Sequence, residues 1–121
     1  MRILLFLFII SIKFVNAEVI DIDNSELKNL IEKDVNIIDV RTQNEWKSTG
    51  IINGSILMSL LDKKNKFIFD NWYKDFNKKI SRNEAVILVC ALGVRSKYIS
   101  NLINKKNPDL KIYNLKKGIN N

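Results

Sequence analysis

The residues best suited to chemistry are Cys90 and Arg95, which lie five positions apart, with Gly93 between them and Ser96 directly after. A cysteine thiolate is a nucleophile, and a nearby guanidinium or a helix N-terminus favours the thiolate over the neutral thiol. The chain has no histidine, so a cysteine–histidine pair cannot activate the thiol. We therefore expect the loop dipoles and Arg95 to activate Cys90 for nucleophilic attack.

A buried strand and a helix are predicted on either side of this loop. The unbroken apolar run 86–89 is typical of a strand covered on both faces in a parallel sheet, and residues 98–103 show helical spacing. The N–H groups of such a loop and of the first helical turn form an anion site at the positive end of the helix dipole. Gly93 permits a positive φ and a close approach to a ligand. Ligands of open α/β sheets bind at the carboxyl ends of the strands, where Cys90 is expected.

Strands and helices alternate along the rest of the chain. Strands are expected at 19–21, 35–40 and 110–115, and capping residues predict helices that begin near Asp23, Thr42 and Asp70. An aromatic stripe over residues 69–80 is interpreted as core, and Asn107-Pro108 is predicted to end the helix after the loop. This alternation predicts an α/β fold, with a small, open, mostly parallel sheet flanked by helices.

The amino-terminal segment, residues 1–17, is predicted to be a cleaved signal peptide. It has a basic start, an apolar run over residues 3–12, and small or short residues at 15–17 where a signal peptidase would cut. The apolar run is shorter than the roughly 20 residues of a membrane-spanning helix. A lipoprotein signal is excluded because Cys90 is the only cysteine. We expect a single domain at 18–121 in the periplasm or outside the cell; the alternative is an uncleaved membrane anchor.

The composition limits the partners of this domain. A single cysteine cannot form an internal disulfide, so Cys90 is a free thiol. The formal charge of +7 becomes +5 when the two cations of the signal segment, Arg2 and Lys13, are removed. A modest basic excess suits small anionic substrates. The lysines are scattered among acidic residues, which indicates a solvated surface rather than a nucleic-acid site.

Three segments together resemble the rhodanese-homology domains, the single-domain sulfurtransferases. Residues 90–96 resemble the active loop of that family, residues 38–55 resemble its earlier signature, and residues 112–119 resemble its last strand and turn. The chain departs from the family at Ile51 and Asn53, where histidine and proline are common. Family members usually continue past the last strand with a tryptophan and a closing helix, so we expect a less covered core there, or a partner that completes it.

The resemblance implies a sulfur-transfer cycle. The Cys90 thiolate would take sulfur from a small anionic donor such as thiosulfate, hold it as a persulfide, and pass it to a thiophilic acceptor such as cyanide or a thiol. The resemblance implies no metal or organic cofactor. From the scattered lysines we expect no nucleic-acid partner, and from the cleaved signal we expect no membrane partner. The implied substrate-binding residues are those of the active loop: Ala91, Leu92, Gly93, Val94, Arg95 and Ser96.

Other polar residues near these motifs have structural interpretations. Arg95 can bind an anion, hold the loop through a carboxylate, or do both, because a guanidinium presents five donors. Ser96 is interpreted as the helix N-cap. Asp39 and Arg41 are interpreted as scaffold, and Glu45 is explained by a capping box with Thr42.

Three alternatives remain open. The first is a non-catalytic sulfur carrier or a thiol-binding module for a protein partner. The second is a phosphatase of the related cysteine–loop–arginine type; its loop is one residue longer, whereas only four residues separate Cys90 from Arg95 here. The third is a redox sensor, in which a thiol of low pKa forms mixed disulfides.

Overall fold

The computed structural model describes residues 3–4, 7–12, 18–81 and 84–120. The strands in these ranges all pair in parallel, in the order β1-β5-β4-β2-β3. This arrangement confirms the predicted α/β fold. The elements are β1 (Ile20–Ile22), α1 (Asn24–Glu32), β2 (Asn36–Asp39), α2 (Gln43–Thr49), β3 (Ile56–Leu57), α3 (Phe69–Lys79), β4 (Val86–Val89), α4 (Val94–Lys106) and β5 (Ile112–Leu115).

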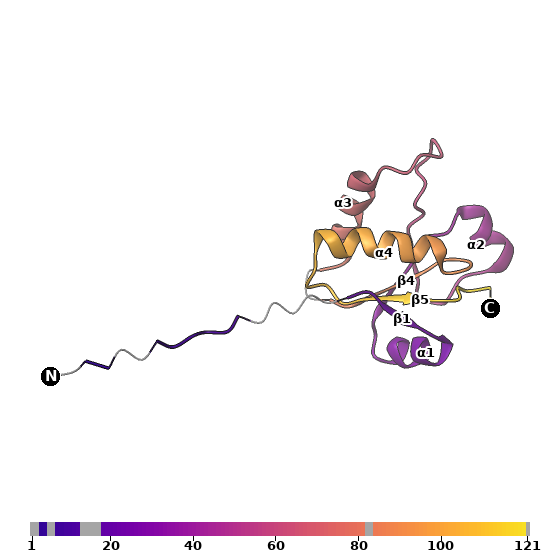
Figure 1. Ribbon diagram of the computed structural model, residues 1–121. Coiled ribbons are helices and arrows are strands. Elements are labelled where there is room, and N and C mark those ends of the chain that lie inside the picture. The colour runs from indigo at the N-terminus through magenta and orange to yellow at the C-terminus, as the bar shows by residue number, and fades with distance from the viewer. Residues whose placement is uncertain (1–2, 5–6, 13–17, 82–83, 121) are drawn as a thin grey trace.

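Strand β4 lies in the middle of the sheet, and all four of its side chains are fully buried. Successive side chains of a strand point to opposite faces. Leu88 accordingly packs with Ile99 of α4 and Phe76 of α3, whereas Ile87 packs with Leu27 of α1. Figure 1 shows α1 on one side of the sheet and α3 and α4 on the other. The apolar run 86–89 is therefore a strand covered on both faces, as predicted.

The aromatic stripe of α3 is core. Trp72 and Phe76 are buried and stack with ring centroids 5.5 Å apart. The prediction that Asp70 caps this helix is wrong. The N-cap is Ile68, which makes no side-chain capping bond, and Asp70 lies in the first turn, where its charge is favourable to the helix dipole.

The starts of α1 and α2 and the end of α4 agree with the sequence patterns. The Asp23 carboxylate accepts from the N–H of Glu26 at 2.8 Å at the start of α1, and Thr42 and Glu45 form the capping box of α2. Helix α4 ends just before Asn107, as expected. Strand β1 begins and ends one residue later than predicted, and the two-residue edge strand β3 was not predicted, because it lies in a turn-rich passage.

The described part of the predicted signal segment, residues 3–4 and 7–12, contains no helix or strand. Its apolar side chains are between 71% and 90% exposed, and the segment leads away from the domain (Figure 1). The predicted cleavage site at 15–17 lies outside the described residues. None of the helices in the described residues has the length and apolar character needed to cross a membrane.

Candidate functional site

Cys90 lies at the carboxyl end of the central strand β4, and helix α4 begins four residues later. The cysteine itself is only 1% exposed, whereas its loop neighbours Leu92 and Val94 are 64% and 73% exposed. The loop therefore surrounds a buried sulfur with an apolar, solvent-facing rim. This is the strand–loop–helix arrangement that the sequence predicts.

Three polar groups converge on the sulfur. The backbone N–H of Gly93 donates to Sγ at 3.1 Å and the backbone N–H of Ser96 donates at 3.4 Å. The Ser96 hydroxyl lies 3.3 Å from Sγ. Burial raises the pKa of the Cys90 thiol, but the hydrogen bonds from the Ser96 side chain and from the backbone of Ser96, Leu92 and Gly93 outweigh it, so the pKa lies below its ordinary value.

Ser96 is not the N-cap of α4, contrary to the prediction. The N-cap is Gly93, whose φ of 87° lets the helix begin at Val94. Ser96 consequently lies inside the first turn and is fully buried. Its hydroxyl therefore lies beside Cys90.

The segment after β5 supports the back of the loop. A Cβ at Gly93 would clash with the carbonyl oxygen of Lys116, and one at Gly118 would clash with that of Ala91. The N–H of Ile119 donates to the Cys90 carbonyl at 2.9 Å, and the N–H of Asn120 donates to the Ala91 carbonyl at 3.1 Å. These contacts hold the Cys90 loop against the segment after β5.

Arg95 forms a bidentate ion pair with Glu45 of α2. Its Nη1 and Nη2 donate to the two carboxylate oxygens at 2.7 and 2.8 Å. The hydrogen bonds from Arg95 hold the pKa of Glu45 at about 2, and the same pairing raises the pKa of Arg95. Glu45 also completes its capping box, with Oε1 3.4 Å from the N–H of Thr42. The sequence pattern identified the capping box but not the pairing with Arg95.

Asp39 and Arg41 form a second, buried ion pair. Nη2 of Arg41 lies 2.8 Å from Oδ2 of Asp39, and both side chains are at most 1% exposed. The guanidinium also donates to Oγ1 of Thr49 and to the carbonyl of Gly50, each at 2.7 Å. These bonds join the end of β2 to the end of α2, which is the kind of contact that the scaffold interpretation expects.

The sequence analysis did not predict a polar chain behind Cys90 that runs from the buried Ser96 and Asn114 to the partly exposed Asp21 and Lys97. The Ser96 hydroxyl donates to Oδ1 of Asn114 at 2.6 Å, and Nδ2 of Asn114 donates to Asp21 at 3.1 Å. Lys97 pairs with the same carboxylate at 3.0 Å. A sequence signal existed, because Asn114 falls two residues after Ile112 and so shares its inward face of β5.

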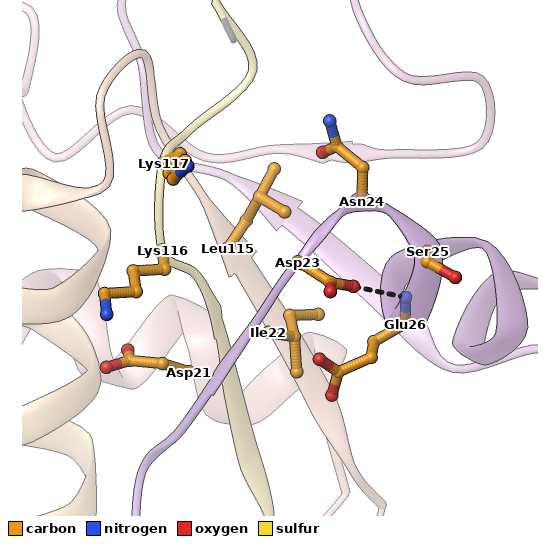
Figure 2. A pocket seen from close by; sticks show the side chains of 9 residues that line it. All are labelled: Asp21, Ile22, Asp23, Asn24, Ser25, Glu26, Leu115, Lys116 and Lys117. Atoms are coloured by element: carbon orange, nitrogen blue, oxygen red, sulfur yellow. Dashed lines mark hydrogen bonds between the residues drawn. The ribbon is translucent and has the colours of Figure 1, made fainter.

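Among the described residues, no group of three or more histidine, cysteine, aspartate or glutamate side chains could hold a metal ion. A pocket of about 490 Å³ lies where β1 and β5 end (Figure 2). It contains both acidic and basic side chains, so its charge does not select a ligand of one sign. Its described lining leaves out Cys90 and consists of Asp21, Ile22, Asp23, Asn24, Ser25, Glu26, Leu115, Lys116 and Lys117.

Comparison with solved structures gives related folds. A rhodanese-like domain protein from Staphylococcus aureus is 27% identical, with a TM-score of 0.62 over 84% of this chain and 88% of that chain. Reduced CoADR-RHD from Bacillus anthracis has a TM-score of 0.67 at 24% identity, over 84% of this chain but only 16% of that one. At 24% identity, the similarity to CoADR-RHD shows a shared fold and nothing more.

A relative by sequence is the uncharacterized protein RP600 of Rickettsia prowazekii (strain Madrid E). It is 38% identical over an alignment of 77 residues, and the match covers 55% of this chain and 55% of RP600. The match thus spans about half the length of that relative. A family model for the rhodanese-like domain matches residues 23–121, which include β2, the Cys90 loop and β5. The chain therefore belongs to the rhodanese-like domain family.

Proposed function

We propose that this protein is a sulfurtransferase that carries sulfane sulfur as a persulfide on Cys90. The donor is a small anion such as thiosulfate, and the acceptor is a thiophile such as cyanide or a thiol. The observation that carries the proposal is the buried Sγ, which receives the N–H groups of Gly93 and Ser96 at 3.1 and 3.4 Å. Such a site stabilises negative charge on sulfur without histidine.

The first half-reaction loads the cysteine. The Cys90 thiolate attacks the outer sulfur of thiosulfate, a new sulfur–sulfur bond forms at Sγ, and the bond to the sulfonate sulfur breaks, so sulfite leaves with the electron pair. In the second half-reaction, cyanide attacks the outer sulfur of the persulfide and leaves as thiocyanate. Sγ departs as a thiolate, and the N–H groups that contact it in the resting loop stabilise this leaving group.

Arg95 supports binding of the donor. Its side chain is 40% exposed, and two of its five N–H donors bond the Glu45 carboxylate. The guanidinium can thus still donate to a sulfonate oxygen at the mouth of the loop. Its pairing with Glu45 fixes the direction of the guanidinium plane, which reduces the ordering that binding requires.

We propose in addition that the protein acts after export, as a single domain at 18–121, in the periplasm or outside the cell. The supporting observations are the basic start, the apolar run and the short side chains at 15–17. Amino-terminal sequencing of the protein expressed from its full coding sequence tests this. A mature chain that begins at Glu18 supports cleavage, whereas an intact Met1 in a membrane fraction supports the uncleaved anchor.

The function is tested by intact-mass measurement of the reduced protein before and after thiosulfate, and then after cyanide with detection of thiocyanate. We expect a gain of one sulfur atom that cyanide removes, and no gain in Cys90→Ala. Stable loading that cyanide cannot remove would favour a sulfur carrier for a protein partner. Failure to load with thiosulfate or other persulfide donors, together with Cys90-dependent hydrolysis of phosphate esters, would favour the phosphatase alternative.

A further inference from the structure

Two groups compete for the single hydroxyl hydrogen of Ser96. Oγ lies 2.6 Å from Oδ1 of Asn114 and 3.3 Å from Sγ of Cys90. A hydroxyl has one hydrogen to donate and two lone pairs to accept with. The short distance to Asn114 assigns the hydrogen to the amide oxygen when Cys90 is protonated, and the thiol then donates its own hydrogen to Ser96.

Asp21 fixes the amide of Asn114 in the orientation that produces this competition. A carboxylate only accepts hydrogen bonds, so the NH₂ group of Asn114 faces Asp21 at 3.1 Å and the amide oxygen faces Ser96. The two residues are register partners on the adjacent strands β1 and β5, and Asn114 is only 2% exposed.

The Asp21 carboxylate is itself held in place. Lys97 pairs with it at 3.0 Å, and its pKa is lowered first by the hydrogen bond from Asn114 and then by the one from Lys97. Figure 2 shows its side chain on the other side of β1 from Ile22, with Lys116 beside it. The carboxylate is therefore ionised at neutral pH, and the amide cannot reverse without placing its oxygen against a negative charge.

When Cys90 ionises, its thiolate becomes a second acceptor for the hydroxyl hydrogen of Ser96. A thiolate has no hydrogen to donate, and its best contact with Ser96 is a donated O–H. If the hydroxyl turns to Sγ, the oxygens of Ser96 and Asn114 face each other at 2.6 Å with no hydrogen between them. The amide oxygen therefore opposes the stabilisation that Ser96 gives to the thiolate.

We propose that Asn114, held by Asp21, is a positioning residue that retains the Ser96 hydroxyl hydrogen and so limits the stabilisation of the Cys90 thiolate. The intrinsic nucleophilicity of a thiolate falls as the pKa of its thiol falls. A partly stabilised thiolate is thus the better nucleophile toward a sulfur donor. This role deepens the proposed sulfur transfer and rests on it for its purpose, but the hydrogen-bond competition itself does not.

Other charges near the loop are unchanged when Asn114 is replaced by a neutral residue. They come from every element that packs around the site, and several are paired with one another. They are Arg95 and Lys97 of α4, Glu45 of α2, Asp39 of β2 with Arg41 after it, Asp21 of β1, and Lys116 after β5.

The test is the pH dependence of iodoacetamide alkylation, which reports on one thiol because Cys90 is the only cysteine. We expect Asn114→Ala to shift the alkylation profile to lower pH, because the hydroxyl hydrogen is freed. Below the midpoint of the profile, the thiolate fraction should rise by roughly two- to tenfold, the ratio that corresponds to one neutral hydrogen bond. Ser96→Ala should shift the profile to higher pH.

The double variant, Ser96→Ala with Asn114→Ala, tests whether the shift depends on the Ser96 hydroxyl. In a Ser96→Ala background, Asn114→Ala should produce no further shift, because no hydrogen remains to be released. Ile112→Val is the matched control, since Ile112 is a buried side chain of the same strand that packs in the apolar core and cannot form a hydrogen bond. Its profile should match that of the unchanged protein. Circular dichroism checks that each variant is folded.

A second variant covers the case in which Asn114→Ala does not fold. Asp21→Asn lets the amide of Asn114 reverse and donate to Ser96, which should also shift alkylation to lower pH. The change in charge is screened by measuring at about 1 M salt, where the Debye length is about 3 Å. An unchanged profile, a shift to higher pH, or a shift that persists without the Ser96 hydroxyl would overturn the proposal. Alkylation needs no sulfur donor, so failure of sulfur loading would count against the proposed function alone.

Discussion

Two arginine–carboxylate pairs lie beyond the carboxyl ends of β2 and β4, and they differ in burial and in remaining donors. In the Arg41–Asp39 pair both side chains are at most 1% exposed. In the Arg95–Glu45 pair the side chains are 40% and 30% exposed. The residue types are equivalent, but the surroundings differ.

Each of the three guanidinium nitrogens of the buried Arg41 donates a hydrogen bond to a neighbouring residue. Arg41 bonds both oxygens of Asp39, and its remaining nitrogen contacts are with Thr49 and Gly50 at the end of α2. A guanidinium held on all sides cannot turn toward a ligand. Its contribution is to fix α2 relative to β2, because an unpaired charge in that position would be strongly destabilising.

The exposed pair depends on the buried one. Glu45 lies in α2, the helix whose last residues Arg41 holds, and it reaches Arg95 at the start of α4. The buried pair therefore positions the carboxylate that orients Arg95 beside the Cys90 loop. One arginine thus determines where α2 lies, and the other uses that position at the site.

The largest expected effect is the loss of the buried pair. Asp39→Ala leaves Arg41 charged and unpaired, which should lower the free energy of unfolding by about 3–5 kcal/mol. Urea denaturation measures this loss. Replacing both residues, as Asp39→Leu with Arg41→Met, should recover much of it, because the uncompensated charge is gone. A loss below about 1 kcal/mol, the range of an exposed pair, would contradict the assignment.

A smaller effect, on chemistry rather than folding, is expected from Arg95→Gln. Loss of a charge-assisted hydrogen bond of about 1.5–3 kcal/mol corresponds to roughly a 10- to 150-fold slower loading of Cys90 by thiosulfate. The free energy of unfolding should fall by no more than about 1 kcal/mol, because the pair is partly exposed. Timed mass measurement gives the loading rate. A lower melting temperature with unchanged loading would assign Arg95 to the scaffold as well.

Local patterns predicted the features that are themselves local. The capping box of Thr42 and Glu45 spans four residues, and the apolar run 86–89 is one strand, so both can be read from neighbouring side chains. The position of Cys90 at the end of β4 follows from that run and from the helical pattern after the loop.

Contacts between distant segments could not be predicted in this way. Glu45 and Arg95 are 50 residues apart, and Asp21 and Asn114 are 93 apart, so no periodicity joins them. The prediction that Ser96 is the N-cap of α4 was wrong for a related reason. The N-cap depends on the positive φ of Gly93, a residue that lies against the carbonyl of Lys116 from the far end of the chain. The strand order decides which residues meet, and it is not local information.

The smallest expected effect is a pH dependence of the stability that the exposed Arg95–Glu45 pair contributes. Hydrogen bonds from Arg95 hold the pKa of Glu45 at about 2 in the folded protein, below the ordinary glutamate value of 4.5. A carboxylate with a depressed pKa stabilises the folded state above its unfolded pKa, and this contribution is lost as the pH falls through the folded pKa. The stability difference between the unchanged protein and Glu45→Gln should therefore be constant at neutral pH and shrink from about pH 4.5 toward pH 2.

Because the pair is partly exposed, this difference should stay within the roughly 0–1 kcal/mol range of surface ion pairs at neutral pH. Urea denaturation of both proteins across the acid range measures it, and added salt should reduce it, as expected for charges near solvent. A difference that is insensitive to salt, or that persists unchanged to pH 2, would contradict the assignment of this stabilisation to the Arg95–Glu45 ion pair.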